Sequence, residues 1–306
     1  MSAAQLLAID WGTSNLRASL LGAGGAVLES RAAAGGVMAV ADGRFAEALN
    51  ALCGDWIEAH ACPAIASGMV GSRQGWREAP YVECPASLAQ VAAQLTRIEL
   101  TPRVALRIVP GLRCTGADGF EDVMRGEETQ LWGAALAPGS CCVLPGTHSK
   151  WAWVGDAGEV TRFQTFMTGE LYGLLTQHGI LGRLMQFGHE RPAAFERGVQ
   201  RGVAEHASAT HAIFAARTAG LLGRIEPEGL ADFLSGMLVG IEIGAAVRNG
   251  RPARVTLLGD EALCRRYEAG LALAGIASAR AAADATTRGQ WRVAQRAGLV
   301  LEEKMA

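Results

Sequence analysis

Short apolar runs separated by turn residues dominate the first part of the chain. The runs cover residues 6–10, 16–21 and 26–31. Gly12 and the sequence GAGG lie in the turns between them. Strands this close in sequence can pair only as antiparallel hairpins. A helical spacing of apolar residues follows over 45–60, and a strand-like run over 64–70. The pattern predicts a three-stranded antiparallel meander followed by a helix and a further strand.

The remaining chain alternates between the two kinds of pattern. Apolar spacing predicts helices over residues 87–100, 126–137, 168–179, 193–206, 211–225 and 261–275, an apolar helix from about Pro227, and a last helix from about Thr287. Strands are predicted over residues 103–111, 253–260 and 277–283. Because strands alternate with helices near the C-terminus, we expect the strands there to add in parallel to a second sheet.

The opening pattern returns from Ser140. Residues 140–166 again show an apolar run, a Gly-Thr turn, a second run, a glycine-containing turn and a third run. Gly12-Thr13 then aligns with Gly146-Thr147, and GAGG falls near GDAG. This weak repeat indicates two similar units, each a meander followed by helices. The repeat could be a chance coincidence. Otherwise the protein is bilobal, with a cleft between two similar cores.

Composition narrows the class of protein. The 306 residues suffice for one large domain or two ordinary ones, and half of them are apolar. Lys and Arg number 28 against 30 Asp and Glu, with no basic stripe interleaved with aromatics, so nucleic acid is not expected as a partner. Seven scattered cysteines without C-x-x-C indicate reduced thiols in a cytoplasmic protein. No signal peptide is expected, and the apolar helix carries Asp232 and Glu242, which favours a buried core helix over a membrane span.

The first turn carries residues suited to phosphate chemistry. Asp10 ends a strand where its carboxylate could hold Mg²⁺ through water. Gly12 lets the backbone approach a phosphate, and Thr13, Ser14 and Asn15 supply hydrogen-bond donors. The alternative is an ordinary hairpin turn.

A second donor-rich turn occupies the matching place in the repeat. Gly146, Thr147, His148 and Ser149 form it, and Lys150 follows. This turn could also be a simple hairpin. If the two units face each other, however, two such turns could hold the β- and γ-phosphates of a nucleotide from both sides.

Three further stretches could carry chemistry. Arg125 precedes Glu127 and Glu128 at a predicted helix start, where the helix dipole alone explains acids but a general base is equally possible. Residues 66–86 form a polar stretch that either lines a site or is a surface excursion. Gly259 lies at a strand–helix junction, which could bind a purine or an α-phosphate or be an ordinary junction. There is no Walker A or G-x-S-x-G motif.

The motifs together resemble one kinase family. AIDWGTSNLRASL, SGMVGSRQGWREAPYVECPA, VMRGEETQLWGA, LPGTHSKW, TGELY and FLSGMLVGIEI stand in the order found in 2-dehydro-3-deoxygalactonokinases, which phosphorylate 2-keto-3-deoxygalactonate. That family is related to the acetate and sugar kinases, Hsp70 and actin. The resemblance implies an α/β fold of two ribonuclease-H-like (actin-like ATPase) domains with a central cleft, here residues 1–125 and 126–306. It also implies ATP-dependent phosphorylation of the sugar acid at its C6 hydroxyl in galactonate breakdown.

The resemblance also implies roles for individual residues. The first phosphate loop, with Mg²⁺ on Asp10, would comprise Asp10, Gly12, Thr13, Ser14 and Asn15. The second would comprise Gly146, Thr147 and His148, and Gly259 would lie in the nucleotide-binding turn. The second loop has no acid equivalent to Asp10, and LLGDEAL replaces a double glycine at the nucleotide turn.

For the catalytic base we favour Glu128, then Glu127, with Asp122 slightly earlier in the chain. Arg125 is the first candidate for binding the substrate carboxylate. Arg17 and Lys150 follow it, and Ser72 and Trp76 are expected to line the sugar-acid pocket.

Three other interpretations stay open at this point. The chain could be a kinase for another sugar or sugar acid, an actin-like ATPase with a regulatory or assembly role, or a phosphatase of the same superfamily. A small-molecule substrate is expected, with neither nucleic acid nor a membrane as partner, and a homodimer is possible.

Overall fold

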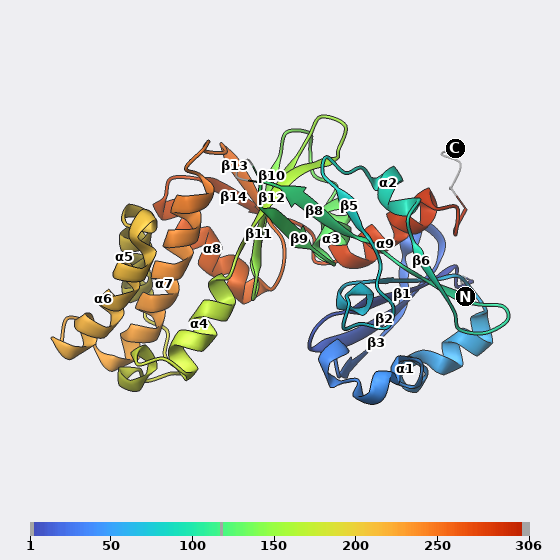
Figure 1. The fold of residues 1–306 in the computed structure, drawn as a ribbon, viewed down its shortest axis with the longest axis horizontal. Coiled ribbons are helices and arrows are strands. Elements are labelled where there is room, and N and C mark those ends of the chain that lie inside the picture. The colour runs from blue at the N-terminus through green and yellow to red at the C-terminus, as the bar shows by residue number, and fades with distance from the viewer. Residues whose placement is uncertain (1–2, 117–118, 302–306) are drawn as a thin grey trace. The chain divides into compact units, whose positions relative to one another are not determined.

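The computed structural model describes residues 3–116 and 119–301, which form two compact units. Of the described residues, the first unit comprises 3–116, 119–139, 154–162 and 282–301, and the second comprises 140–153 and 163–281. Each unit is built on a mixed β-sheet with helices packed on it, and the first unit also holds a smaller sheet (Figure 1). The division at residues 125 and 126 stays a prediction about domains. The compact units interleave along the chain because the C-terminal helix packs within the first unit.

The first unit is built on a six-stranded sheet with the order β3-β2-β1-β4-β7-β6. Its strands are β1 (Leu6–Trp11), β2 (Asn15–Leu21), β3 (Val27–Ala34), β4 (Ala64–Ser67), β6 (Thr96–Glu99) and β7 (Ala105–Ile108). β1 to β3 form the predicted antiparallel meander, β4 is parallel to β1, and β7 is parallel to β4. A smaller sheet holds β5 (Tyr81–Glu83), β8 (Gly111–Thr115) and β9 (Glu121–Met124).

One predicted helix in this unit is half wrong. Residues 87–100 split into α2 (Leu88–Ala92), which starts with a capping box of Ser87 and Gln90, and the strand β6. The apolar spacing over this stretch fits a helix, but residues 96–99 gain a full antiparallel ladder with β7. Strand pairing that is remote in sequence therefore overrides the local preference.

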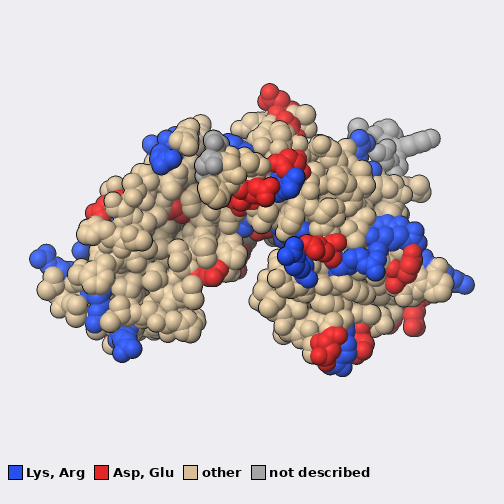
Figure 2. Space-filling model, in the orientation of Figure 1, with Lys and Arg blue, Asp and Glu red and all other residues tan. Residues whose placement is uncertain are grey.

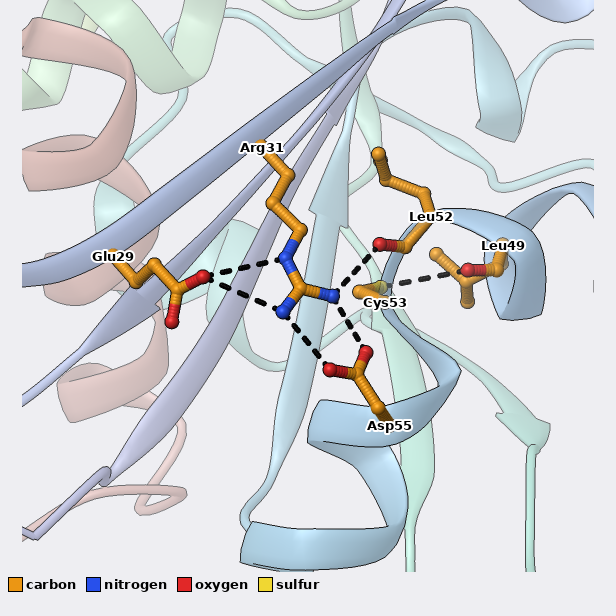
Figure 3. A network of polar contacts seen from close by, with 6 residues as sticks. All are labelled: Glu29, Arg31, Leu49, Leu52, Cys53 and Asp55. Carbon is orange, nitrogen blue, oxygen red and sulfur yellow. Dashed lines mark hydrogen bonds and ion pairs between the residues drawn. The ribbon is translucent and has the colours of Figure 1, made fainter.

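Helix α1 (Phe45–His60) covers one face of the meander. Figure 3 shows how β3 and α1 are joined: the guanidinium of Arg31 donates to both carboxylate oxygens of Asp55, at 2.5 and 2.9 Å, and to the carbonyl of Leu52 at 3.1 Å. Arg31 also lies 4.0 Å from the ring centroid of Trp56. These exposed contacts attach α1 to the edge strand β3. The buried apolar side chains beneath them provide most of the stabilisation of this packing.

The second unit repeats the strand order of the first. Its sheet runs β12-β11-β10-β13-β14, with β13 parallel to β10 and β14 parallel to β13. The strands are β10 (Cys141–Leu144), β11 (Ser149–Val154), β12 (Val160–Phe166), β13 (Arg254–Leu257) and β14 (Ala277–Arg280). Both sheets share the order 3-2-1-4 and continue with a strand parallel to the fourth, β7 in the first sheet and β14 in the second. This shared order confirms the internal repeat and the α/β fold class predicted from it.

Helices make up most of the second unit. They are α4 (Thr168–Gln177), α5 (Pro192–Ala204), α6 (Ala209–Leu221), α7 (Pro227–Ala246) and α8 (Glu261–Leu273). α5 and α7 pack with almost no space between their backbones: a Cβ atom added at Gly198 would lie 2.1 Å from the carbonyl oxygen of Phe233. Among the described residues only α7 is long and apolar enough to cross a membrane, and most of it is buried within the unit. The prediction of a core helix is therefore confirmed.

Helix α9 (Ala285–Arg296) belongs to the first unit and packs on α3 (Glu127–Gly133). A Cβ atom at Gly133 would lie 1.7 Å from the carbonyl oxygen of Ala285, so the two helices touch backbone to backbone. The buried amide of Gln290 donates to the carbonyl of Ile9 at 2.6 Å and to Ser67 Oγ at 2.9 Å. α9 therefore fixes α3 against the ends of β1 and β4.

Short 3₁₀ turns connect several of these elements. They are η1 (Ala23–Gly25), η2 (Val37–Ala39), η3 (Ala41–Gly43), η4 (Met69–Gly71), η5 (Leu181–Leu184) and η6 (His206–Ser208). All seven cysteines are free thiols, as predicted, and five of them are buried. Basic and acidic side chains lie interspersed on the face seen in Figure 2, in keeping with the small net charge.

Candidate active site

The first predicted phosphate loop is the turn between β1 and β2. The backbone N–H of Gly12 donates to the carbonyl of Asn15 at 3.0 Å, which closes the turn. Thr13, Ser14 and Asn15 are exposed, so their donors face solvent and are available to a ligand. A Cβ atom at Gly36 would lie 2.1 Å from the carbonyl oxygen of Thr13, so only glycine lets the following loop support the turn this closely.

Asp10 lies at the base of this turn, directly opposite Arg17 in the β1–β2 ladder. The carboxylate is partly exposed and forms a long ion pair with Arg17 at 3.5 Å. Burial raises the pKa of Asp10, and Arg17 opposes the shift. Both side chains line a cavity of about 300 Å³ together with Ser19, Thr287 and Gln290. Arg17 is therefore a weak partner of the Asp10 carboxylate, which remains accessible to a cation that binds it more strongly.

Two glycines bring the α3 start close to this turn. Gly68, after β4, has a φ of 95°, and its added Cβ would lie 2.8 Å from the carbonyl oxygen of Trp11 and 3.7 Å from Asp10 Oδ1. Gly126 has a φ of 108°, and its added Cβ would lie 3.1 Å from the Cα of Gly68. Positive φ and close backbone contact both require glycine here. The first turn and the acids that follow Gly126 thus lie on one side of the unit.

Glu127 and Glu128 lie in different environments at this helix start. Glu128 is 0 % exposed; one of its oxygens accepts from the N–H of Gly126 at 2.6 Å and the other from Thr129 Oγ1 at 2.8 Å. Burial, followed by the nearby Glu127 charge, raises the pKa of Glu128 to about 7. Glu127 is half-buried and accepts from the N–H of Arg125 at 3.1 Å. Glu128 therefore titrates near neutral pH, as a general base requires.

Arg125 is a buried cation that has unpaired hydrogen-bond donors. It is 8 % exposed, donates from Nη2 to the carbonyl of Ala79 at 2.8 Å, and lies 4.3 Å from the ring centroid of Tyr81. Its Nε and Nη1 are buried and have no hydrogen-bond partner among the described residues, as is also true of Ser72 Oγ. A Cβ atom at Gly71 would lie 2.9 Å from Arg125 Nη1. Such unpaired buried groups are rare without a ligand or water to satisfy them.

Trp76 belongs to an aromatic cluster in the same unit. Its ring stacks on Phe45 with centroids 6.2 Å apart and meets Trp11 edge-on at 6.3 Å. Trp11 Nε1 is buried without a hydrogen-bond partner among the described residues. Trp11 is the last residue of β1, so the rings of this cluster form an apolar surface at the end of the strand that carries Asp10. Of the residues predicted for the sugar-acid pocket, Ser72, Trp76 and Arg125 all lie in this unit.

The second predicted phosphate loop is the turn between β10 and β11. The start of α4 packs on it: a Cβ atom at Gly169 would lie 2.5 Å from the carbonyl oxygen of Gly146, and the N–H of Glu170 donates to the carbonyl of Thr147 at 3.0 Å. The ring of His148 pairs with the Glu170 carboxylate. The turn is thus held from behind, and Thr147 and His148 remain exposed.

Lys150 lies beneath this turn. Its ammonium group donates to the carbonyl of His148 at 2.9 Å, and the residue is only 4 % exposed. Lys150 therefore supports the second loop from below. It belongs to the second unit, whereas Arg17 and Arg125 belong to the first.

Gly259 follows β13 beside the second loop. Its φ is 140°, and an added Cβ atom would lie 3.4 Å from the carbonyl oxygen of Pro145. The next residue, Asp260, caps α8 by accepting from the N–H groups of Ala262 and Leu263. A cavity of about 190 Å³ adjoins the loop, lined by Gly146, Thr168, Gly169, Tyr172, Ser235, Leu238, Val239, Leu263, Arg266 and Tyr267. The second unit therefore combines a donor-rich turn with a mainly apolar cavity.

Several residues near these turns were not singled out from the sequence. Glu242 was taken as a sign against a membrane span, yet its buried carboxylate accepts hydrogen bonds beneath the second loop. Gln290 lies far along the chain from Ile9, to which it donates. The signal available for Glu242 was an acid within an otherwise apolar helix. Nothing in the local sequence marks Gln290.

Comparison with known proteins identifies the family. The sequence profile of the 2-keto-3-deoxy-galactonokinase family matches residues 10–293. The chain is 39% identical over 268 residues to the 2-dehydro-3-deoxygalactonokinase of Escherichia coli K12, covering 87% of this chain and 88% of that protein. A crystal structure of a protein described as a 2-dehydro-3-deoxygalactonokinase, from Sinorhizobium meliloti, superposes with a TM-score of 0.86 at 37% identity, covering 95% of this chain and 98% of the other.

A xylulose kinase from Lactobacillus acidophilus shares the fold alone, with a TM-score of 0.50 at 10% identity, covering 97% of this chain and 90% of the other. The family match extends over both turns, the start of α3 and most of α9. The chain therefore belongs to the 2-keto-3-deoxy-galactonokinase family.

Proposed function

We propose that this chain transfers the γ-phosphoryl group of ATP to the C6 hydroxyl of 2-dehydro-3-deoxy-D-galactonate, giving the 6-phosphate and ADP in galactonate breakdown. The observation that carries the proposal is the family match over residues 10–293, which spans both predicted phosphate loops and the start of α3. The match to the Escherichia coli relative covers most of both chains, and the name of that relative specifies the sugar acid.

The substrate carboxylate would bind at Arg125. Its Nε and Nη1 are buried and have no hydrogen-bond partner among the described residues, so each can donate a charge-assisted hydrogen bond to an anion. Ser72 Oγ, unpaired like the Arg125 groups, offers a further donor to the sugar acid. Trp76 would contribute an apolar wall. Arg17 beside Asp10 and Lys150 beneath the second loop are the less favoured cations.

Glu128 would accept the proton of the C6 hydroxyl. Each of its oxygens accepts one hydrogen bond from its own helix start, which orients the carboxylate and leaves a lone pair free. Its pKa of about 7 lets it be deprotonated at neutral pH and still accept a proton. Glu127, the half-buried neighbour, is the alternative base.

The donors of the two turns would bind the phosphates of ATP. Thr13, Ser14 and Asn15 are exposed on the first turn, and Thr147 and His148 on the second. The cavity beside Gly146 and Gly259 would accept the nucleoside. Phosphoryl transfer needs little covalent chemistry from the protein, so positioning and charge neutralisation would supply most of the rate.

The residues at the first turn fit a magnesium ion. Among the described residues no cluster of three or more His, Cys, Asp or Glu could enclose a metal. Mg²⁺ in kinases instead uses one or two carboxylates together with substrate phosphates and water. Asp10, partly exposed and only weakly paired with Arg17, is such a carboxylate. When bound with ATP, the ion would neutralise charge on the phosphates.

A coupled assay for ADP release tests the function. The purified protein would be offered 2-dehydro-3-deoxygalactonate, its gluconate epimer, other sugar acids and neutral sugars, with MgATP. We expect the galactonate compound to give the highest kcat/KM and a product phosphorylated at C6 by ³¹P NMR. A neutral sugar that outperforms the acids would overturn the substrate assignment. ATP hydrolysis that no sugar stimulates would favour the actin-like ATPase alternative.

A homodimer and a cytoplasmic location complete the proposal. Light scattering during size-exclusion chromatography tests the first, and a mass equal to one chain would exclude it.

A further inference from the structure

One buried carboxylate in the second unit accepts an unusual number of hydrogen bonds. Glu242, on α7, is 1 % exposed. Its Oε1 accepts from Ser149 Oγ at 2.7 Å and from Trp151 Nε1 at 2.8 Å. Its Oε2 accepts from Tyr267 Oη at 2.6 Å and from Thr168 Oγ1. Four side-chain donors thus satisfy the carboxylate, and a buried charge persists only when paired in this way.

The donors come from the elements that shape the second loop. Ser149 begins β11, directly after the exposed Thr147 and His148. Thr168 begins α4, whose next residue packs on the carbonyl of Gly146. Tyr267 lies on α8, the helix that follows Gly259. Glu242 therefore joins three elements that are far apart in sequence.

The carboxylate lies behind the cavity wall. Thr168 and Tyr267 both line the cavity beside Gly146, whereas Glu242 does not. Tyr267 Oη also lies 3.2 Å from Ser149 Oγ, which closes a small network of hydroxyl groups around the carboxylate. A change at Glu242 would reach a bound nucleotide only by moving these neighbours.

We propose that Glu242 is the positioning residue of the nucleotide site, setting the second phosphate loop and the α4 and α8 walls through its four hydrogen bonds. The inference rests on the proposed function in that the second unit binds the nucleotide, and it does not depend on which sugar is phosphorylated. It predicts a defect in nucleotide binding that loss of stability alone does not produce.

Two substitutions at Glu242 separate geometry from charge. In Glu242→Gln the amide oxygen still accepts from Ser149 and Trp151, while the amide nitrogen donates to the two hydroxyls at the other position, which can turn to accept. In Glu242→Leu all four donors lose their acceptor. We therefore expect the glutamine variant to keep the loop in place and the leucine variant to release it.

The experiment measures binding of ADP with Mg²⁺ by calorimetry, without any sugar, together with thermal unfolding. We expect the dissociation constant to rise by about tenfold or more in Glu242→Leu and to stay within about threefold in Glu242→Gln. Leu234→Ala is the matched control, because Leu234 is fully buried on the same helix and does not line the cavity. It should lower the unfolding temperature with binding unchanged.

Ser149→Ala covers the case in which Glu242→Leu fails to fold. Ser149 is fully buried, so it reaches a nucleotide only through the loop, and its loss should weaken ADP binding by a few-fold. Wild-type binding in Glu242→Leu or, if that variant is unfolded, in Ser149→Ala would overturn the inference. So would an equal loss of binding in Leu234→Ala. If the wild type binds ADP but phosphorylates no sugar, the proposed function fails. The ADP-binding measurements then still test the role of Glu242.

Discussion

Gly126 and Gly68 meet backbone to backbone: a Cβ atom added at Gly126 would lie 3.1 Å from the Cα of Gly68. Both residues have positive φ angles, 108° and 95°, which L side chains rarely adopt. Gly68 in turn lies against Trp11 and Asp10. The spacing between the first phosphate loop and the acids of α3 is therefore set by two glycines without intervening side chains.

Substitution of Gly126 by alanine should damage catalysis more than stability. The unfavourable φ costs about 1–2 kcal/mol, and the close contact must open by a few tenths of an ångström. Because the N–H of Gly126 orients Glu128, we expect kcat to fall about tenfold or more with ADP affinity nearly unchanged. Steady-state kinetics and calorimetry measure the two. Gly139→Ala, with a φ of 73° and open space around it, is the control for backbone strain alone. A kcat equal to wild type in Gly126→Ala would contradict the role of this contact.

The activity should depend on pH through Glu128. A general base works only when deprotonated, and the pKa of Glu128 is about 7. We expect kcat/KM to rise about tenfold per pH unit below that value and to level off above it. Glu128→Gln should lower kcat by orders of magnitude with ADP still bound. If Glu127→Gln has this effect and Glu128→Gln does not, the base is the neighbour.

The same group makes stability depend on pH. The folded pKa of Glu128, about 7, lies above its ordinary value of 4.5, so the folded protein holds this proton more tightly than the unfolded chain. The contribution is complete below pH 4.5 and is lost as the pH rises toward 7. A shift of this size amounts to about 3 kcal/mol. Urea unfolding at pH 5.5 and pH 8 should show Glu128→Gln gaining stability relative to wild type at the higher pH; equal gains at both would contradict the shift.

The sequence predicts the fold better than it predicts the contacts of the site. The two meanders follow from the local spacing of apolar residues. The alignment of Gly12-Thr13 with Gly146-Thr147 matched the two units correctly. The end of the helix over residues 87–100 was missed because β6 forms only by pairing with β7, a contact remote from its own sequence. Local preference cannot report such partners.

Site residues divide in the same way. Asp10 and Glu128 could be proposed from the sequence because one lies near a strand end and the other near a helix start, positions that the sequence shows directly. Glu242 and Gln290 act through donors or acceptors far away along the chain, at Ser149 and Ile9 for example. One sequence without these contacts offers no means of pairing them.

Arg125 should control affinity for the sugar acid and leave the nucleotide unaffected. Arg125→Met keeps much of the apolar volume beside Tyr81 but removes the donors, and a charge-assisted hydrogen bond contributes about 1.5–3 kcal/mol. We expect KM for the sugar acid to rise about 10- to 100-fold with KM for ATP within about threefold. Arg113→Met, an exposed position on β8 paired with Glu83, is the control and should match wild type. An unchanged KM for the sugar acid in Arg125→Met would move the carboxylate site to another cation, with Arg17 the next to test.

Asp10 should determine the use of magnesium. Asp10→Asn keeps the shape of the side chain but removes the charge that a hard cation requires, and no second acid occupies the matching place in the second turn. We expect turnover to fall to background and the Mg²⁺ concentration needed for half-maximal ATP binding to rise at least about tenfold. Ser19→Ala, in the same cavity and hydrogen-bonded to Ser30, is the matched control and should keep the wild-type Mg²⁺ requirement. Turnover at the wild-type rate in Asp10→Asn, at equal Mg²⁺, would mean that another group holds the ion.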